Sequence, residues 1–335
     1  MIYIRIDKKQ NITSLMLSNR DIILKNREKQ LFINEKNIYE NVDDFFISAD
    51  NEFILFNIID GCISLKKDLT FTQKASRFFL KVTTNCDNLT FQTDIESNTY
   101  LFLNNNKLEK EIELISNYNW EFIFCDHNTF FLYDKIILKA ISYPTCKNTW
   151  KILLQEYGEI RKILGVKEEK IWVSIYRGGI NKDKNILLAL DIVSGEVVYQ
   201  SPSEYDLSDW FIELLSEKNS ILSIYGKMST HQADSPFVEI NATTGAVIRN
   251  HRIESLYLEN LKIGFWKVLD NKIYFTANKD TLHGRHIGIL DYNTLEILWQ
   301  TEISDLRGTF KDFQVSDNKI YALDTGNQLH IFEKE

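Results

Sequence analysis

Three segments of this sequence align without a gap and decide its fold. They are Asp191-Ile-Val-Ser-Gly-Glu-Val-Val-Tyr-Gln200, Asn241-Ala-Thr-Thr-Gly-Ala-Val-Ile-Arg-Asn250 and Asp291-Tyr-Asn-Thr-Leu-Glu-Ile-Leu-Trp-Gln300. Each segment starts 50 residues after the previous one, at positions 191, 241 and 291. A regular spacing of this size is typical of proteins built from repeated structural units. The segments therefore mark three copies of one unit.

The chemistry of each segment is that of a hairpin turn. Its first residue is Asp or Asn, whose side chain can accept hydrogen bonds from backbone amides within the turn. Gly195 and Gly245 supply the positive φ that the end of such a turn requires. Leu295 replaces this glycine in the third copy, so we expect a different turn there.

A second landmark is a short apolar strand that follows each aromatic residue at a nearly constant distance. Trp299 precedes Ile320 by 21 residues, and Trp150 precedes Ile171 by the same 21. The second pair extends the repeat backwards by one unit.

Each unit offers four short strand-like stretches. In the unit from about 160 to 200 they are Ile160–Val166, Ile171–Arg177, Ile186–Asp191 and Glu196–Gln200. Four antiparallel strands in a repeat of about 40–50 residues form one blade of a β-propeller. Phe211–Ser216 and Trp150–Leu164 can also be interpreted as short amphipathic helices, but both occupy places where the repeat requires strands.

The N-terminal half is more divergent, with candidate units at about 8–40, 41–73, 77–113 and 120–154. The last unit, from Thr309, stops one strand short, and the alternating segment Ile2–Ile6 is the natural donor of the missing strand. Pairing the first strand with the last blade would close the ring and remove both open edges. This division predicts an all-β propeller of eight blades, or seven if the first two short units merge.

Composition sets the class of protein and limits its partners. The chain has 335 residues, 39 Lys+Arg and 47 Asp+Glu, which give a formal charge of −8. An acidic balance argues against a general nucleic-acid binder, which needs a basic face to meet phosphate. The repeat spans the whole length, so we expect a single domain over residues 1–335.

The sequence favours a cytoplasmic location. The N-terminus lacks the continuous apolar stretch of a signal peptide, and no apolar run approaches the roughly 18 residues of a membrane span. The cysteines are widely spaced, and reduced, mostly buried thiols are expected. They are Cys62, Cys86, Cys125 and Cys146.

The segment around Asp191 resembles the pyrroloquinoline-quinone-type repeat of quinoprotein-like β-propellers, in which a strand ends in Ala-Leu-Asp, a turn ends in Thr-Gly and an outer strand ends in Trp. The matching residues are Ala189-Leu190-Asp191, Ser194-Gly195, Tyr199, Thr244-Gly245, Leu290-Asp291 and Trp299. The resemblance covers about 150–335 well and 1–150 weakly, and it implies blade architecture. Enzymes of that family use calcium, the quinone and adjacent cysteines. This chain has no adjacent cysteine pair, so we expect no cofactor.

Candidate binding residues lie in polar segments between predicted strands. Arg177 opens the longest polar turn, which lacks the glycine pattern of a nucleotide-binding loop. His283, Arg285 and His286 form a cluster without a Cys or carboxylate at a diagnostic metal-ligand spacing, so contact with a ligand or protein is favoured over metal binding. Trp210 lies beside polar residues before an apolar strand, where it could anchor a partner or pack in the core.

No catalytic signature is present: no serine lies in a GxSxG elbow, and no Cys/His signature appears. We therefore predict a non-catalytic protein-binding propeller rather than an enzyme. A sharper hypothesis is a bacterial immunity-type protein that neutralises a basic toxin, since acidic charge speeds capture of a basic partner. The alternative is a hydrolase or lyase with its active site in the axial pocket of the propeller.

Overall fold

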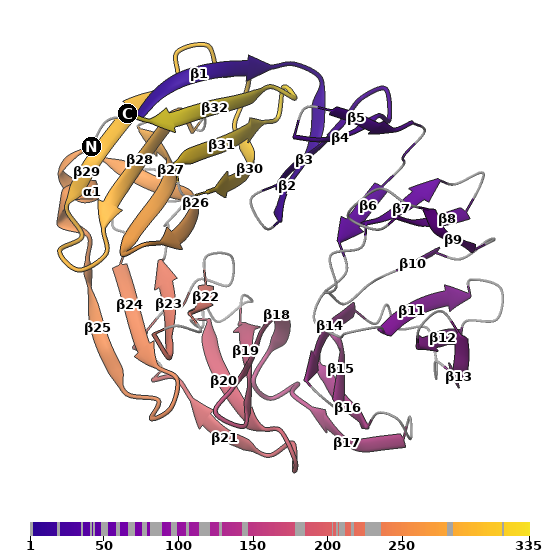
Figure 1. Cartoon of the computed structure of the whole chain (residues 1–335). Helices are drawn as coiled ribbons and strands as arrows, with labels where there is room; N and C mark the ends of the chain where they lie inside the picture. Colours follow the sequence, from indigo (N-terminus) through magenta and orange to yellow (C-terminus); the bar gives the residue numbers. More distant parts are fainter. Residues whose placement is uncertain are drawn as a thin grey trace. The chain divides into compact units, whose positions relative to one another are not determined.

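A computed structural model of the chain consists almost entirely of β-strands (Figure 1). It describes the chain except for residues 1–2, 19–20, 35, 41, 43, 48–52, 58–60, 66–70, 76–78, 81–88, 95–98, 105–106, 114–120, 127–128, 143–146, 178–184, 203, 206, 208–211, 216–217, 225–235, 280–283 and 317. Only the backbone is described for residues 6, 16–18, 21, 37–39, 130 and 134 and for the strands between 44 and 126.

The described strands form eight four-stranded antiparallel sheets, and four of these precede residue 154. The first contains β2 (Ile12–Ser18), β3 (Asp21–Asn26), β4 (Leu31–Ile33) and β5 (Lys36–Tyr39). The second contains β6 (Asp44–Ile47), β7 (Phe53–Asn57), β8 (Gly61–Leu65) and β9 (Phe71–Ala75). The third contains β10 (Phe79–Leu80), β11 (Leu89–Asp94), β12 (Thr99–Asn104) and β13 (Lys107–Glu113). The fourth contains β14 (Glu121–Asp126), β15 (Thr129–Asp134), β16 (Ile137–Ser142) and β17 (Lys147–Leu153).

Three further sheets contain the repeated segments. One consists of β18 (Glu159–Lys167), β19 (Lys170–Tyr176), β20 (Ile186–Asp191) and β21 (Val197–Gln200). The next consists of β22 (Ile212–Leu215), β23 (Ser220–Ile224), β24 (Pro236–Asn241) and β25 (Val247–Arg252). The third consists of β26 (Leu261–Leu269), β27 (Lys272–Lys279), β28 (His286–Asp291) and β29 (Ile297–Glu302). In each of these sheets the strands follow one another in chain order, and we number them first to fourth.

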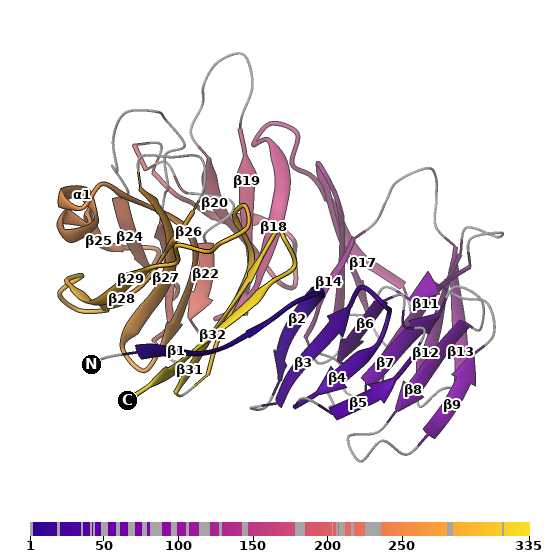
Figure 2. The same ribbon diagram turned by 90° about the horizontal axis from the view of Figure 1, so that it is seen from above.

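The eighth sheet joins the two ends of the chain. Its first three strands are β30 (Phe310–Val315), β31 (Lys319–Asp324) and β32 (Leu329–Lys334), and its fourth is β1 (Tyr3–Lys9). β1 lies antiparallel beside β32, with Tyr3 opposite Lys334 and Lys9 opposite Leu329 (Figures 1 and 2). The N-terminal strand therefore completes the last sheet, as the sequence predicts, and we call this the closing sheet.

The strand content confirms the repeat and decides between the sequence interpretations. The two short N-terminal units form separate sheets, β2–β5 and β6–β9, in agreement with the eight-unit division. The helical interpretation of 150–164 and 211–216 is wrong, because both regions contribute strands. One element was not anticipated, the five-residue helix α1 (Glu254–Leu258) between β25 and β26. Among the described residues, no helix is long and apolar enough to cross a membrane.

The expectation of a different turn at Leu295 is wrong. Gly195, Gly245 and Leu295 all have positive φ, at 74°, 75° and 58°. In each copy the residue's amide donates to the carbonyl at the start of the turn, over 2.9, 2.8 and 2.9 Å. Leucine adopts the left-handed conformation at some cost in strain, and its side chain is buried, so packing offsets that cost.

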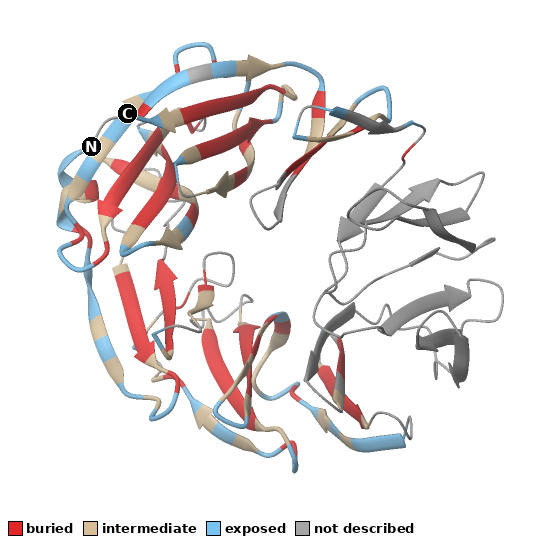
Figure 3. Ribbon diagram, viewed as in Figure 1, coloured by how far each residue is buried: buried red, intermediate tan, exposed pale blue. Residues whose placement is uncertain are grey.

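Burial explains why the middle strands are continuously apolar. Every residue from Ile171 to Ile175 is buried, because the second and third strands are covered on both faces (Figure 3). A strand of this kind is a run of apolar residues without alternation. The fourth strands β21 and β29 alternate between half-buried and exposed residues, as expected where one face meets solvent.

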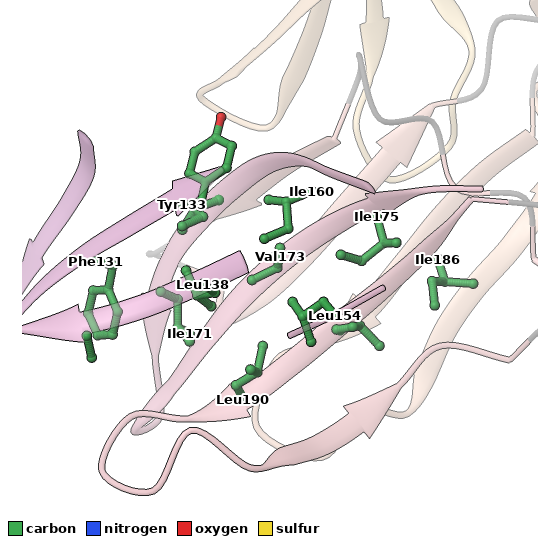
Figure 4. Close-up of a cluster of buried hydrophobic side chains, with 13 residues drawn as sticks. Phe131, Tyr133, Leu138, Leu154, Ile160, Ile171, Val173, Ile175, Ile186 and Leu190 are labelled. Atoms are coloured by element: carbon green, nitrogen blue, oxygen red, sulfur yellow. The ribbon is translucent and has the colours of Figure 1, made fainter. Parts of the chain in front are cut away.

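Contacts group the chain into two compact units, one of residues 1–41, 222–240 and 247–335, the other of 42–221 and 241–246. In the second unit, buried side chains of β15, β16, β18, β19 and β20 form one core, with Phe131, Ile171 and Leu190 among its members (Figure 4). In the first unit, one core lies between the β26–β29 and closing sheets, and another between the closing and β2–β5 sheets. Whether residues 1–335 behave as a single domain stays a prediction.

Candidate binding edge

Two kinds of connection emerge at the same edge of each sheet. Because successive strands alternate in direction, the connection from second to third strand lies beside the connection from the fourth strand to the next sheet. Backbone hydrogen bonds join the two kinds. Leu207 N donates to Asn185 O over 3.4 Å, and Ile303 N donates to Arg285 O over 2.8 Å. We call this side of a sheet its connection edge.

The second-to-third connections differ in length from sheet to sheet. They are short in the sheets built by β2–β5 and β14–β17 and in the closing sheet, where β31 ends at Asp324 and β32 begins at Leu329. They are longer in three consecutive sheets, where they run from Tyr176 to Ile186, from Ile224 to Pro236 and from Lys279 to His286. Loops on a rigid scaffold are where binding residues concentrate. These three connections therefore make the connection edge of each of these sheets a candidate site.

Arg177 lies at the start of the first long connection, directly after β19. Its Nε donates to Tyr157 O over 2.9 Å, and its backbone N donates to Asn185 Oδ1 over 3.3 Å. The guanidinium thus ties the turn before β18 to the connection after β19. A guanidinium has five N–H donors, of which this side-chain bond uses one.

Arg161 lies close to this edge on β18. Its guanidinium carbon lies 4.3 Å from the centre of the Tyr176 ring, a cation–π contact. Arginine and tyrosine are the residue types most enriched at protein interfaces. The connection edge of the β18–β21 sheet therefore carries two arginines and two tyrosines, namely Arg161, Arg177, Tyr157 and Tyr176.

Arg285 and His286 end the third long connection. Both are half-buried, and His286 is the first residue of β28, opposite Ala277 on one side and Glu302 on the other. The Nδ1 atom of His286 is buried and has no hydrogen-bond partner. Burial lowers the pKa of His286, Glu302 opposes this effect, and Lys279 adds to it. The imidazole is therefore neutral at pH 7, as a hydrogen-bonding group or packing surface rather than a cation.

His283 and Trp210 lie outside the described residues, so their predicted roles stay predictions. In the sequence, His283 precedes β28 and Trp210 precedes β22. Arg177 and Arg285 thus belong to second-to-third connections, and His286 begins the strand that follows one of them.

Sequence reasoning missed the most exposed apolar side chain at a connection edge. Leu258, at the end of α1, is 74% exposed. Charged groups lie on the same connection: Arg252 stacks on the Tyr257 ring at 3.6 Å and pairs with Glu254 over 2.7 Å. No sequence signal reveals α1, because a helix of five residues is too short to produce a readable periodicity.

The described residues offer little to a metal or an enzyme mechanism. Among them, no group of three His, Cys, Asp or Glu side chains could hold a metal ion. On β30, burial raises the pKa of the Asp312 carboxyl. That carboxyl accepts bonds from Phe313 N over 2.7 Å and Gln314 Nε2 over 3.2 Å. A buried carboxyl with a raised pKa is a feature that enzyme active sites often have.

Comparison with known proteins identifies the architecture. No family profile matches the sequence, and no curated protein matches it significantly. The C-terminal WD40 domain of Sif2 superposes with a TM-score of 0.68 at 11% identity, covering 100% of this chain and 99% of that one. BamB from Moraxella catarrhalis gives 0.60 at 12% identity over 99% and 100%. Sqt1 from Saccharomyces cerevisiae gives 0.61 at 10% identity over 99% and 97%.

The fold is that of a β-propeller. The propeller neighbours match essentially the full length of this chain, and each four-stranded sheet is one blade. BamB is a propeller of the quinoprotein-like repeat, the group that the Asp191 segment resembles. At 8–12% identity these neighbours establish the fold and not the activity.

Proposed function

We propose that this propeller is a non-catalytic binding protein whose partner is another protein. The observation that supports the proposal is the concentration of long second-to-third connections on three consecutive blades, β18–β21, β22–β25 and β26–β29. A rigid blade with a long connection presents side chains in a fixed arrangement at little entropic cost on binding.

The connection edge has the composition of a protein interface. Leu258 is an exposed apolar group flanked by the Arg252–Glu254 pair and by the Glu259–Lys279 pair, whose atoms lie 3.6 Å apart. An apolar anchor inside a polar rim is the arrangement that carries most binding energy at interfaces. Arg177, held by Tyr157, supplies a pre-oriented donor group on its own blade.

The sharper form of the proposal is an immunity-type protein that neutralises a basic toxin in a bacterial cytoplasm. Its support is the formal charge of −8, because opposite net charge accelerates association. It predicts that the association rate falls as ionic strength rises.

The test is capture of a partner from native lysate by the full chain, followed by binding measurements on the purified pair. Leu258→Ser and Arg285→Glu should each weaken binding at least tenfold. Leu298→Ser, at a 41% exposed position on the fourth strand β29, is the matched control and should bind normally. Equal binding by all three variants would refute the connection edge as the interface. If a neighbouring toxin is neither bound nor inhibited, the immunity form fails while the protein-binding form survives.

A hydrolase or lyase is the second candidate, and Asp312 is the observation that favours it. If Asp312 is the general acid of such an enzyme, Asp312→Asn abolishes the hydrolase or lyase activity while leaving the unfolding temperature almost unchanged. Binding of a protein partner that is unaffected by Asp312→Asn favours the first candidate.

A further inference from the structure

Three matched positions of the blade are polar in the closing sheet and apolar in the β18–β21 sheet. The positions are the sixth residue of the second strand, the residue paired with it, and the residue two further on. They are Ile175, Ile186 and Leu188 in the β18–β21 sheet, Ala277, His286 and Gly288 in the β26–β29 sheet, and Asp324, Gln328 and His330 in the closing sheet. Cross-strand partners and residues two apart project from the same face of a sheet. The closing sheet therefore carries a polar cluster where another blade has only aliphatic side chains.

This cluster is sealed from solvent. Asp324 and His330 are 0% exposed, and Gln328 is 1% exposed. Neighbours on the same face, such as Ala322 and Phe332, belong to the apolar core shared with the β26–β29 sheet. Polar side chains in such surroundings need hydrogen-bond partners, because water no longer solvates them.

Asp324 is fully engaged. Its Oδ1 accepts from Gln328 N over 2.8 Å. Its Oδ2 accepts from Arg307 N over 3.1 Å and lies 3.2 Å from His330 Nε2. A carboxylate is an acceptor, so His330 Nε2 carries the proton of this bond. The remaining ring nitrogen, Nδ1, is then an acceptor without a proton.

Three atoms of the cluster have no hydrogen-bond partner. They are Gln328 Nε2, Gln328 Oε1 and His330 Nδ1. The backbone groups of Gln328 are themselves engaged, since Gln328 O accepts from Asp324 N over 2.9 Å and Gln328 N donates to Asp324 Oδ1. The unmet groups are an amide donor, an amide acceptor and an imidazole acceptor. A bond from the amide to the imidazole would satisfy two of them and leave Oε1 buried and unpaired.

We propose that the closing sheet contains an internal water site formed by Gln328 and His330. Water donates two hydrogen bonds and accepts two, which matches an acceptor pair and a donor. The site is separate from the connection-edge residues of the proposed function. Its ligand class is a single small hydrogen-bonding molecule that both donates and accepts.

The N-terminal strand lies beside this site in the same sheet. Lys8 of β1 lies opposite His330 in the strand register. Arg5 and Lys8 of β1 both pair with Asp305, over 2.6 and 2.9 Å, and so fasten β1 to the connection that supplies Arg307. The site therefore lies next to the strand that completes the last sheet.

A crystal structure of the full chain that resolves ordered water tests the proposal directly. We expect a water within about 2.7–3.2 Å of His330 Nδ1 and of the Gln328 amide. Absence of density there, with the amide packed against Nδ1 or turned to solvent, would overturn the proposal.

The variant Gln328→Leu provides a second test, because the direction of the change in unfolding temperature distinguishes a bound water from an unpaired amide. If water is bound, leucine removes its partners, and the unfolding temperature falls. If the amide is buried without a partner, the apolar side chain of similar size is better accommodated, and the unfolding temperature rises. Gln300→Leu, at an exposed position of β29, is the matched control and should leave the unfolding temperature unchanged. A rise for Gln328→Leu above that control contradicts the proposal.

Discussion

The fourth strand of one blade docks on the hairpin turn of the next blade in two different ways. Between the β14–β17 and β18–β21 sheets, the Trp150 ring lies directly over Gly195, where an added Cβ would lie 2.5 Å from the ring. The indole Nε1 donates to Ile192 O over 3.0 Å. Between the β22–β25 and β26–β29 sheets, Arg249 occupies the position of the tryptophan and Leu295 that of the glycine.

The second interface keeps one feature of the first. Arg249 Nη1 donates to Tyr292 O over 2.9 Å, and Tyr292 follows the Asp of its turn just as Ile192 does. The same carbonyl is therefore bound by an indole in one place and by a guanidinium in the other. Glu239 compensates the new charge, accepting from Arg249 Nε and from the Tyr292 hydroxyl, both over 2.6 Å.

The comparison shows that two positions vary together. One is the fourth-strand residue that packs on the next blade, and the other is the turn residue of that blade beneath it. A flat indole packs only on a turn residue without a side chain, namely glycine. Arg249 instead lies between Phe237 and Tyr292, with its Cζ 4.7 Å from the centre of each ring, and leaves room for a leucine at the turn. Tyr199 on Gly245 keeps the flat ring, but its buried hydroxyl has no hydrogen-bond partner. Burial raises the pKa of Tyr199 to about 12.

The largest effect is expected at the charged interface. Glu239→Gln leaves the half-buried guanidinium of Arg249 without its counter-charge, and the loss of one partner of a buried pair costs at most about 3–5 kcal/mol. Urea unfolding of the full chain measures it. Glu254→Gln removes an ion pair whose side chains are 39% and 58% exposed, and it should change the free energy of unfolding by less than about 1 kcal/mol. Equal effects of both variants would show that the Glu239 pair is not desolvated.

The next effect is expected at the aromatic interface. Gly195→Ala puts a Cβ against the Trp150 ring at a residue with a φ of 74°, and the left-handed conformation alone costs about 1–3 kcal/mol. Glu196→Ala, one residue on and exposed, is the control and should be almost neutral. Urea unfolding measures both variants. An unchanged free energy of unfolding for Gly195→Ala would contradict a close contact between the Trp150 ring and Gly195.

A double-mutant cycle tests whether positions 249 and 295 are energetically coupled. Arg249→Trp alone meets the Leu295 side chain and loses stability. Arg249→Trp combined with Leu295→Gly recreates the Trp150–Gly195 arrangement and should recover about 1 kcal/mol beyond the sum of the single changes. Additive effects would mean that the two positions vary independently.

The smallest effect concerns pH and involves one histidine of the closing sheet and one of the β26–β29 sheet. Burial lowers the pKa of His330 below its ordinary 6.5, opposed by Asp324 and Asp305 and reinforced by Arg5. Between the two pKa values the unfolded chain binds a proton that the folded chain does not, so the free energy of unfolding falls as the pH drops below about 6.5. His286 contributes with the same sign.

The pH dependence is measured by urea unfolding between pH 7 and about 5.5, a range that avoids carboxylate titration. His330→Leu introduces the residue that the β18–β21 sheet has at the matched position, Leu188. It should reduce the slope of the free energy of unfolding against pH without abolishing it, because His286 remains. An unchanged slope would show that His330 does not hold a lowered pKa.

Much of this fold could be predicted from the sequence because the repeat carries its own local signals. The 50-residue spacing of the turns, the continuous apolar middle strands and the missing final strand are consequences of burial on both faces and of an unpaired edge. The candidate residues at connections, among them Arg177 and Arg285, were also accessible, since polar segments between strands mark loops.

The sequence by itself determined the repeat, the four strands of each blade and the use of the N-terminal strand as the last one. Only the tertiary structure decided how positions far apart in the chain are matched. Leu295 keeps the glycine-type turn because Arg249 of another blade replaces the ring that excludes a side chain. His330 pairs with β1, a strand more than 300 residues away in the chain, and together with Gln328 it is buried only in the folded protein. Periodicity is local and can be read along the chain, whereas compensation between blades depends on contacts that only folding creates.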